Sequence, residues 1–292
     1  MGLKNQIKKA LEILPGKKMI YSGLKSVCTP PESIYKHLYF KGVFNVDVEP
    51  GHRFKINHFG YQVENDIFWK GLYGGWERAT LKVWTQLSKQ ADVILDVGAN
   101  TGVYGLLSTT VRPKAQVFYF EPVKRICARL RQNLKLNEYE GHVYEAALSD
   151  QDGQGVIYDL PSEHLYSVTV NKNLNVDREV KEVPIQLLTL DSFIDQNNLS
   201  KIDLIKIDVE THEPQVLSGF KKHLPEFRPN MIIEILNNDV ARSVGEQLKP
   251  YDYSFYYIDD INNKVEEVET LKAQASMNYL ALRSEERSKY SF

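Results

Sequence analysis

From residue 91 onward, short apolar runs of strand length alternate with segments of helical periodicity, and few folds accommodate that pattern. Helices are expected at 103–111 and 124–136, because apolar residues recur there every three or four positions. Continuous apolar strands that alternate with helices indicate a parallel sheet covered on both faces. The expected fold class is therefore α/β, with a doubly wound, mostly parallel sheet. Its strands are expected at 91–98, 116–122, 142–148, 202–210 and 229–236.

Two other stretches lack this alternation. Residues 153–190 hold only strand-like runs, which indicates a β-hairpin insertion after the third strand. Near the C-terminus, 253–259 and 277–283 fit closing strands. We expect residues 76–292 to form one domain, which begins with a helix that starts near Trp76.

Residues 1–75 are expected to form an α+β extension that contacts the substrate or a second subunit. Its first helix ends near Pro15, with apolar residues on one face and lysines on the others. That apolar stripe either packs on the protein itself or lies on an anionic membrane surface. The β-like runs at 52–59 and 66–73 are expected to pair as a hairpin.

The composition argues against several classes of protein. Of the 292 residues, 42% are hydrophobic and 25% are charged, which is typical of a globular chain rather than a disordered one. The net charge of −2 argues against a dedicated nucleic-acid-binding protein. No apolar run reaches the roughly 20 residues that a transmembrane helix needs. Two widely separated cysteines, Cys28 and Cys127, indicate a reducing compartment, and we expect the cytoplasm.

The run ILDVGANTG is the most informative motif. A buried strand ends near Asp96, and Gly98, Asn100 and Gly102 then lead into a helix. Glycines in such a turn let the backbone approach a ligand, and a helix N-terminus favours a carboxylate. The spacing departs from G-x-G-x-x-G, because Asn100 and Val103 occupy the later glycine positions. An acid two residues before the first glycine suits an ammonium group, which NAD lacks.

A second carboxylate follows at the end of the next strand. Glu121 lies where an acid accepts hydrogen bonds from the hydroxyls of a ribose. A nucleoside joined to an amino acid, without phosphate, describes S-adenosylmethionine. The alternative is that Asp96 and the glycines only build a tight turn, which leaves Glu121 unexplained. The expected cofactor-binding residues are Asp96, Gly98, Asn100, Gly102 and Glu121.

The motifs DVGANTG, FEP and LIKIDVETHEPQVLSG follow one another in this order, and they resemble those of the FkbM family of methyltransferases. The runs GWE at 75–77, NLKLN at 133–137 and TLDSFI at 189–194 are also similar to that family. The resemblance implies a class I, Rossmann-like methyltransferase fold, S-adenosylmethionine as donor, and O-methylation of a sugar or natural-product hydroxyl. One position departs from the family, because Thr211 stands where a glycine usually follows the DVE motif. A Cβ there would alter the local backbone or the shape of the acceptor pocket.

An alcohol is a poor nucleophile until a base accepts its proton, and four candidates for that base follow the fourth strand. Asp208 follows Lys206 by two positions, so both side chains point to the same face of the strand, and Asp208 is expected to face the cleft. His212 is the first choice as the base, because an imidazole titrates near neutral pH, and Asp208 and Glu210 are the alternatives. Glu213 is expected instead to cap the following helix.

Oxygen-bearing side chains near the same strand ends allow a metal as an alternative. Asp208, Glu234 and Asn237 could bind Mg²⁺, which would orient the acceptor and lower the pKa of its hydroxyl. We do not favour a required metal, and the rival interpretation makes Glu234 a substrate-binding residue. Trp76 and Tyr166 are further candidates for contacts with a small-molecule or glycan acceptor.

Two other functions are compatible with a sheet of this kind. An NAD(P)-dependent oxidoreductase would use the same sheet, but the missing middle glycine and the presence of Asp96 argue against it. A non-catalytic cofactor-binding scaffold is disfavoured by the intact set of Asp96, Gly98 and Glu121. The favoured hypothesis is an S-adenosylmethionine-dependent O-methyltransferase that acts on a sugar, glycan or glycosylated metabolite.

Overall fold

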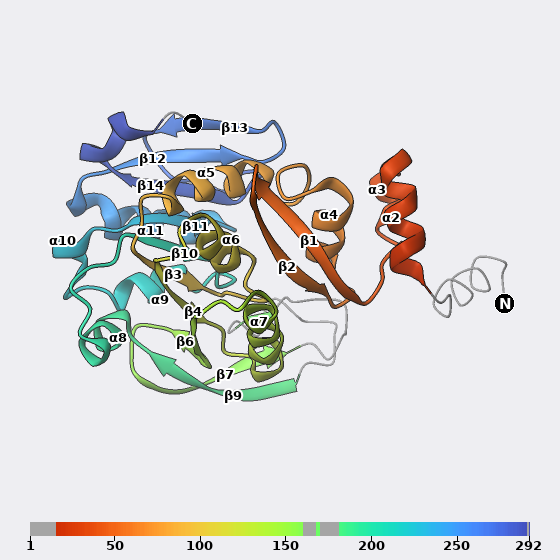
Figure 1. Cartoon of the computed structure of the whole chain (residues 1–292). Coiled ribbons are helices and arrows are strands. Elements are labelled where there is room, and N and C mark those ends of the chain that lie inside the picture. The colour runs from red at the N-terminus through yellow and green to blue at the C-terminus, as the bar shows by residue number, and fades with distance from the viewer. Residues whose placement is uncertain (1–15, 160–167, 170–180, 291) are drawn as a thin grey trace.

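An eight-stranded sheet forms the centre of the computed structural model, which describes residues 16–159, 168–169, 181–290 and 292 (Figure 1). Its strands are β3 (Val93–Val97), β4 (Gln116–Phe120), β5 (His142–Tyr144), β10 (Leu204–Ile207), β11 (Asn230–Glu234), β12 (Tyr253–Asp259), β13 (Lys264–Val268) and β14 (Asn278–Arg283). Their order is β13-β12-β14-β11-β10-β3-β4-β5. The five strands from β11 to β5 run parallel, whereas β14 is antiparallel to both of its neighbours. The predicted doubly wound, mostly parallel sheet is confirmed.

Side chains of the central strands alternate between two apolar cores, one on each face of the sheet. Ile94 and Leu204 belong to the core that contains residues of α5, α6 and α7, whereas Leu95 and Ile205 belong to the core beneath α8, α9 and α11. Both faces are therefore covered, which explains why these strands are apolar throughout. The helices are α5 (Arg78–Ser88), α6 (Val103–Val111), α7 (Lys124–Asn137), α8 (Leu190–Asn197), α9 (Glu213–Ser218), α10 (Leu224–Phe227), α11 (Asn238–Leu248), η2 (Lys249–Tyr251) and η3 (Ser284–Lys289).

Most predicted elements of the main domain are confirmed. The helices expected at 103–111 and 124–136 correspond to α6 and α7, and the closing strands at 253–259 and 277–283 correspond to β12 and β14. The helix expected to start near Trp76 corresponds to α5. β13 was not predicted, because its sequence KVEEV is polar and lies on the outer edge of the sheet.

The prediction of a single strand over 142–148 was wrong. Its first half is β5 in the main sheet, whereas its second half is β6 (Ala146–Leu148), which pairs with β9 in a separate sheet. That sheet has the order β6-β9-β7-β8. The antiparallel pair β7 and β9 confirms the predicted hairpin insertion. Its strands are β7 (Gly153–Asp159), β8 (Val168–Thr169) and β9 (Lys181–Leu188).

The hairpin predicted in the N-terminal region pairs different strands from those expected. β2 corresponds to the run at 52–59, but its antiparallel partner is β1, whereas the run at 66–73 lies mostly in helix α4. Ile67, Phe68 and Trp69 are all buried, so this short apolar run has the same appearance in a helix and in a strand. The elements are α2 (Lys17–Val27), α3 (Glu32–Tyr35), β1 (Gly42–Glu49), β2 (His52–His58) and α4 (Gln62–Lys70). The helix predicted before Pro15 lies outside the described residues.

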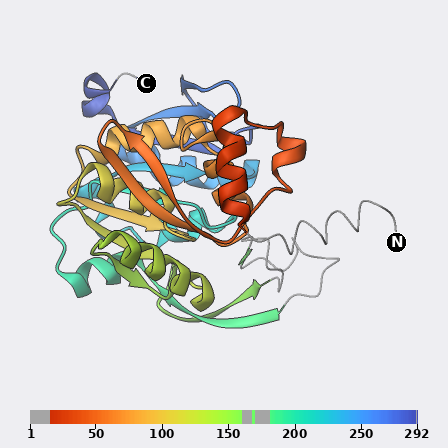
Figure 2. The same cartoon turned by 45° about the vertical axis from the view of Figure 1, so that its right-hand side comes forward.

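The β1–β2 hairpin lies against the main domain, close to α6 and α7 (Figure 2). Phe44 and Ile56 of the hairpin share one apolar core with Leu106 of α6. The side chain of Asn133 in α7 accepts a hydrogen bond from the backbone of Asn57 at 2.9 Å and donates one to the carbonyl of Thr101 at 2.9 Å. The hairpin is thereby connected to the loop that follows β3.

Candidate active site

The loop after β3 brings the backbone of β3 against that of the neighbouring strand. Gly98 has a φ of +80°, and a Cβ at this position would lie 1.8 Å from the carbonyl oxygen of Asp208, so only glycine fits. The amides of Gly98 and Ala99 both donate to the carbonyl of Phe120 at 3.0 Å. The loop is therefore held between the carboxyl ends of β10 and β4, at the point where the chain crosses from one side of the sheet to the other.

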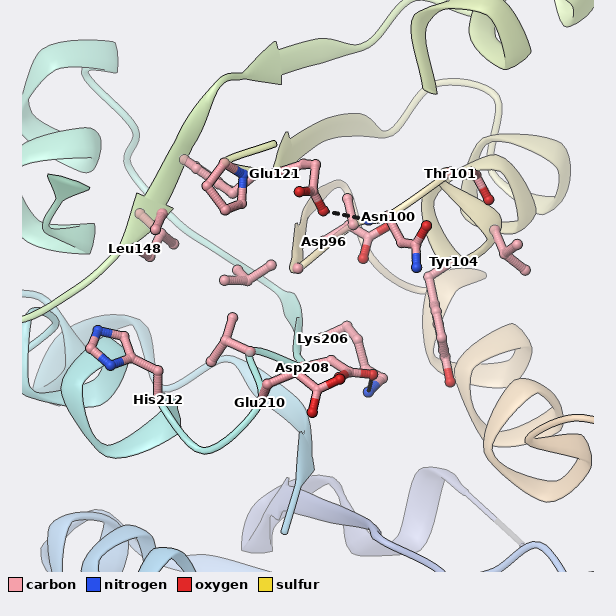
Figure 3. A pocket seen from close by; sticks show the side chains of 18 of the residues that line it. Asp96, Asn100, Thr101, Tyr104, Glu121, Leu148, Lys206, Asp208, Glu210 and His212 are labelled. Atoms are coloured by element: carbon pink, nitrogen blue, oxygen red, sulfur yellow. Dashed lines mark hydrogen bonds and ion pairs between the residues drawn. The ribbon is translucent and has the colours of Figure 1, made fainter. Parts of the chain in front are cut away.

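A pocket opens at these strand ends, and both groups of predicted residues contribute to it (Figure 3). Its polar and aromatic lining includes Trp76, Asp96, Asn100, Thr101, Tyr104, Glu121, Lys206, Asp208, Glu210 and His212, and Gly98 and Val63 also contribute. Of the predicted cofactor residues, Gly102 is not part of the lining. Gly102 precedes α6 with a φ of +88°, and a Cβ there would approach the side chain of Leu130 to 3.2 Å. Its requirement for glycine therefore comes from the packing of α6 against α7.

Asp96 is a buried acid at the centre of the pocket. It is 2% exposed, and one of its oxygens accepts a hydrogen bond from the amide of Gly105 at 3.1 Å. Burial raises the pKa of Asp96 to about 7, against the opposing effect of that hydrogen bond. A cation in the pocket would favour the carboxylate form, so the site is suited to an ammonium group.

Glu121 is held in place by the backbone on either side of it. Its carboxylate accepts hydrogen bonds from the amides of Asn100 at 3.2 Å and Val123 at 2.9 Å, and Figure 3 shows the first of these. The side-chain oxygen of Asn100 is buried, and no residue of the described segments donates a hydrogen bond to it. A buried acceptor without a donor is costly, so this oxygen points to a ligand with hydrogen-bond donors.

A buried charge network forms the opposite wall. Nζ of Lys206 donates to Asp208 at 2.9 Å and to the amide oxygen of Asn278 at 3.0 Å. The Asn278 amide in turn donates to Glu77 at 3.0 Å, and the hydroxyl of Tyr104 also donates to Glu77. Burial alone would lower the pKa of Lys206, but the carboxylates of Asp208 and Glu77 raise it above its ordinary value. Burial raises the pKa of Glu77 itself.

This network was largely missed by sequence reasoning. Lys206 was noted only for its strand parity with Asp208, and Asn278 and Tyr104 were not singled out. A usable signal was present, because a lysine inside the apolar strand LIKI must be paired when both faces of the sheet are covered. Nothing local identifies its partners, since Glu77 and Asn278 lie far from it in the sequence.

The turn after β10 has a strained backbone. Glu210 and Thr211 have φ values of +55° and +80°, so Thr211 adopts the left-handed conformation that the family's glycine would adopt more easily. The carboxylate of Glu213 accepts hydrogen bonds from the amides of Val209 at 3.1 Å and Thr211 at 3.2 Å. Glu213 thus stabilises the turn before α9, at the start of the helix where sequence reasoning had placed it as a cap.

His212 and Asp208 reach the pocket from the same turn but have different partners. Nε2 of His212 lies 3.0 Å from the hydroxyl of Ser149, and burial lowers the pKa of His212, with Asp150 opposing. In Figure 3, Lys206, Asp208 and Glu210 lie together, while the ring of His212 lies apart from them. The three predicted catalytic residues therefore line one pocket without forming one cluster.

Of the three residues considered as metal ligands, Asp208 and Glu234 are close enough for the charge of Asp208 to raise the pKa of Glu234, but Asn237 is engaged elsewhere. The amide oxygen of Asn237 caps α11 by accepting hydrogen bonds from Asp239 at 3.0 Å and Val240 at 2.9 Å. In the described segments, no three His, Cys, Asp or Glu side chains are arranged to hold a metal ion.

Of the three predicted acceptor-binding residues, only one is found in the pocket lining. Glu234 is buried outside the pocket lining, and burial, followed by the charge of Asp208, raises its pKa. Trp76 does line the pocket, and its ring lies 5.9 Å from that of Tyr104. Tyr166 lies outside the described residues.

Comparison with known proteins agrees with this site. The family described as the methyltransferase FkbM domain matches residues 96–268. The 2-O-methyltransferase NoeI of Sinorhizobium fredii is 34% identical over 167 residues, which cover 51% of this chain and 68% of that protein. The 31-O-demethyl-FK506 methyltransferase FkbM of Streptomyces tacrolimicus is 28% identical over 184 residues, or 54% and 70% of the two chains. The hexuronic acid methyltransferase AglP of Haloferax volcanii is 28% identical over 148 residues, or 51% and 58%.

The matched region contains the loop after β3, Glu121 and the whole turn after β10. The order of the central strands and the position of the pocket at their carboxyl ends fit the class I methyltransferase fold that the motifs implied. The chain is therefore an enzyme of the S-adenosylmethionine-dependent methyltransferase class, and it belongs to the FkbM methyltransferase family.

Proposed function

We propose that this protein transfers a methyl group from S-adenosylmethionine to a hydroxyl of a sugar, glycan or sugar-containing metabolite. One observation carries the proposal: a single pocket is lined both by the glycine loop with its two carboxylates and by the turn that bears Asp208 and His212. The names of two relatives, a 2-O-methyltransferase and a hexuronic acid methyltransferase, support a hydroxyl and a sugar acid as the acceptor.

The described residues fit S-adenosylmethionine. Asp96 would hold the ammonium group of its methionine part, and Glu121 would accept hydrogen bonds from its ribose hydroxyls. Gly98 lets the loop pack directly against the backbone of Asp208, so that the loop and the turn after β10 meet at one pocket. The buried oxygen of Asn100 offers a further acceptor. When bound, the cofactor supplies an activated methyl group, and the protein supplies position and electrostatics.

Asp208 is the residue that we assign to the acceptor hydroxyl. Its carboxylate is paired with Lys206 and is 27% exposed, so it can accept a hydrogen bond from the acceptor while Lys206 fixes its orientation. This carboxylate would accept the hydroxyl proton as the acceptor oxygen takes the methyl group, whose bond to the sulfonium sulfur breaks and leaves S-adenosylhomocysteine. His212 was the first choice from sequence, but its Nε2 is already within hydrogen-bond distance of Ser149. His212 is therefore assigned to shaping the acceptor side of the pocket.

The first experiment measures cofactor binding and turnover. Calorimetric titration with S-adenosylhomocysteine should show one site per chain, and the protein should then release S-adenosylhomocysteine from the donor when supplied with hexuronic acids or their glycosides. The product should be heavier by one methylene group. Absence of binding would refute the cofactor assignment, while binding without turnover on any sugar would refute the acceptor class alone.

The second experiment separates Asp208 from His212. Asp208→Asn should keep S-adenosylhomocysteine binding and lose roughly 100- to 10,000-fold in turnover, whereas His212→Gln should lose much less. The opposite ranking, together with an activity that falls as a histidine becomes protonated, would make His212 the base.

A further inference from the structure

Helix α2 lies at the edge of the molecule (Figure 1), and it carries large apolar side chains that no described part of the chain covers. Its inner side is buried, since the ring of Tyr21 packs 5.9 Å from that of Trp69 in α4. On the same helix, Met19 and Val27 are 77% and 83% exposed. Ile20 and, in the next helix, Ile34 are exposed as well. Positions 19, 20 and 27 lie within about 100° of one another around a helix, so these three side chains share one side of α2. Exposed apolar side chains on one side of a helix indicate a surface with a function.

A basic groove lies beside this surface, between α2 and β1. Lys18 and Lys25 of α2 and Lys55 of β2 line it, together with the hydroxyls of Ser22 and Ser26. Among the residues that the structure describes, no carboxylate lines the groove. Asp47, a carboxylate whose charge acts on Lys25, also pairs with Arg53 at 3.5 Å. The groove therefore combines three cations with the hydroxyl of Ser22, a set that suits a phosphate group, while the hydroxyl of Ser26 donates to the carbonyl of Gly23 at 2.7 Å.

The floor of the groove is apolar. Val43, Phe44 and Phe68 line it, and the ammonium of Lys25 lies 5.1 Å from the centroid of the Phe68 ring. Burial lowers the pKa of Lys25, with the charge of Asp47 opposing, which agrees with an ammonium group that is partly removed from water.

Positive charge is also concentrated near the N-terminal end of the chain, from which α2 comes. The first 41 residues contain eight lysines and two glutamates, a net charge of +6, while the whole chain carries −2. The remaining residues therefore carry −8. An acidic body is repelled by an anionic surface, so the distribution of net charge favours attraction through this end of the molecule.

We propose that this end of the protein docks onto an anionic membrane surface. The lysines of the groove bind lipid phosphates, while Met19, Ile20 and Val27 enter the boundary between headgroups and acyl chains. A soluble polyanion would satisfy the lysines but would leave these apolar side chains in water, so the membrane accounts for both features. Within the described segments, no helix has the length and apolar character to cross a bilayer.

Docking would also place the active site near the membrane. Helix α4 contributes Phe68 to the groove and Val63 to the pocket, so one short helix forms part of both walls. This consequence rests on the proposed function, and it favours acceptors that are carried by a lipid.

Co-sedimentation with vesicles tests the docking separately from catalysis. The full-length protein should bind vesicles of phosphatidylcholine with about 30% phosphatidylglycerol, bind vesicles of phosphatidylcholine alone far more weakly, and dissociate as salt rises. The triple variant K18Q/K25Q/K55Q should bind the anionic vesicles on the order of 100-fold more weakly, from about fivefold per lysine. Met19→Ser with Val27→Ser should weaken binding by roughly tenfold without changing its salt dependence.

The matched control is K114Q/K249Q/K264Q, which removes the same charge from exposed positions elsewhere and should bind like the wild type. All variants should retain S-adenosylhomocysteine binding, which shows that they are folded. Equal binding to both kinds of vesicle, or equal losses in the control and the groove variant, would overturn the proposal. Binding of a soluble polyphosphate without any binding to anionic vesicles would overturn the choice of a membrane.

Discussion

The two walls of the pocket are built in different ways. The wall after β3 and β4 is formed by backbone geometry, because Gly98 fits a bend that admits no side chain and Glu121 is held by two amides. The wall after β10 is formed by side chains, because Lys206 joins Asp208 to Asn278 and, through it, to Glu77.

This difference separates two tasks. A rigid backbone loop can hold the same cofactor in every member of a family, because its shape depends on a few consecutive residues. A network of charged side chains can adapt to an acceptor, but each member depends on partners that come from distant parts of the chain. Changes in the first wall should therefore affect cofactor binding, and changes in the second should affect stability and turnover.

The largest effect is expected where the two walls touch. Gly98→Ala would place a Cβ 1.8 Å from the carbonyl oxygen of Asp208, in a backbone conformation that alanine disfavours. We expect a loss of more than about 4 kcal/mol in the free energy of unfolding and no binding of S-adenosylhomocysteine. Denaturant unfolding and calorimetry measure both.

Gly51→Ala is the matched control for this substitution. Gly51 has a φ of +82°, close to that of Gly98, but nothing lies within 4 Å of its added Cβ. Gly51→Ala should lower the free energy of unfolding by only about 1 kcal/mol and should leave cofactor binding unchanged. Equal costs at the two glycines would show that the close approach of β3 to β10 has no energetic consequence.

The next effect concerns the charge network alone. Lys206→Met leaves Asp208 and Glu77 without their cation, so we expect a loss of about 3 kcal/mol in the free energy of unfolding and a loss of turnover. Adding Asp208→Asn should recover part of the stability but none of the turnover. Thermal unfolding and S-adenosylhomocysteine release report the two quantities.

Lys222→Met provides the comparison, because Lys222 pairs with Asp195 on the exposed surface. Removal of the Lys222 charge should lower the free energy of unfolding by less than about 1 kcal/mol. If Lys206→Met and Lys222→Met lower the free energy of unfolding by the same small amount, the network does not provide the stability that we assign to it.

Asp96 lies on the wall after β3 and β4, and its substitution is expected to have a smaller effect, one that depends on pH. Its pKa in the folded protein, about 7, is above the ordinary value, so the folded state binds the proton more tightly and this group's contribution to stability falls as pH rises from about 4 to 7. A ligand ammonium favours the carboxylate form, so the affinity for S-adenosylhomocysteine should rise over the upper part of the same range.

Asp96→Asn should abolish that rise and weaken binding by roughly 10- to 100-fold, while the ligand-free variant should be at least as stable as the wild type above pH 7. Calorimetry at several pH values with a melting curve at each measures both. Affinity that does not depend on pH in the wild type would contradict the role of Asp96 in holding an ammonium group.

The smallest effect is expected at the residue that departs from the family. Thr211→Gly should raise the free energy of unfolding by about 1 kcal/mol, because Thr211 has a φ of +80°. Thr270→Gly, at an exposed position whose φ is not positive, should lower it instead. If both variants have a lower free energy of unfolding than the wild type, the Thr211 side chain makes contacts that compensate for its unfavourable backbone conformation.

The sequence alone determined the alternation of β3, α6, β4 and α7, together with the loop that carries Asp96 and Gly98. These features depend on periodicity and turn chemistry within a few residues, which the order of the amino acids states directly. It also predicted Glu121, because an acid at the end of the second strand has a fixed relation to that loop.

Only the tertiary structure decided how distant segments meet. The pairing of β1 with β2, the division of 142–148 between two sheets, and the burial of Glu234 outside the pocket depend on which neighbours each segment finds. Glu77 and Asn278 are 201 residues apart, yet both reach the network around Lys206. No local pattern encodes such a contact, because it exists only once the strands have taken their order in the sheet and burial has made an unpaired charge costly.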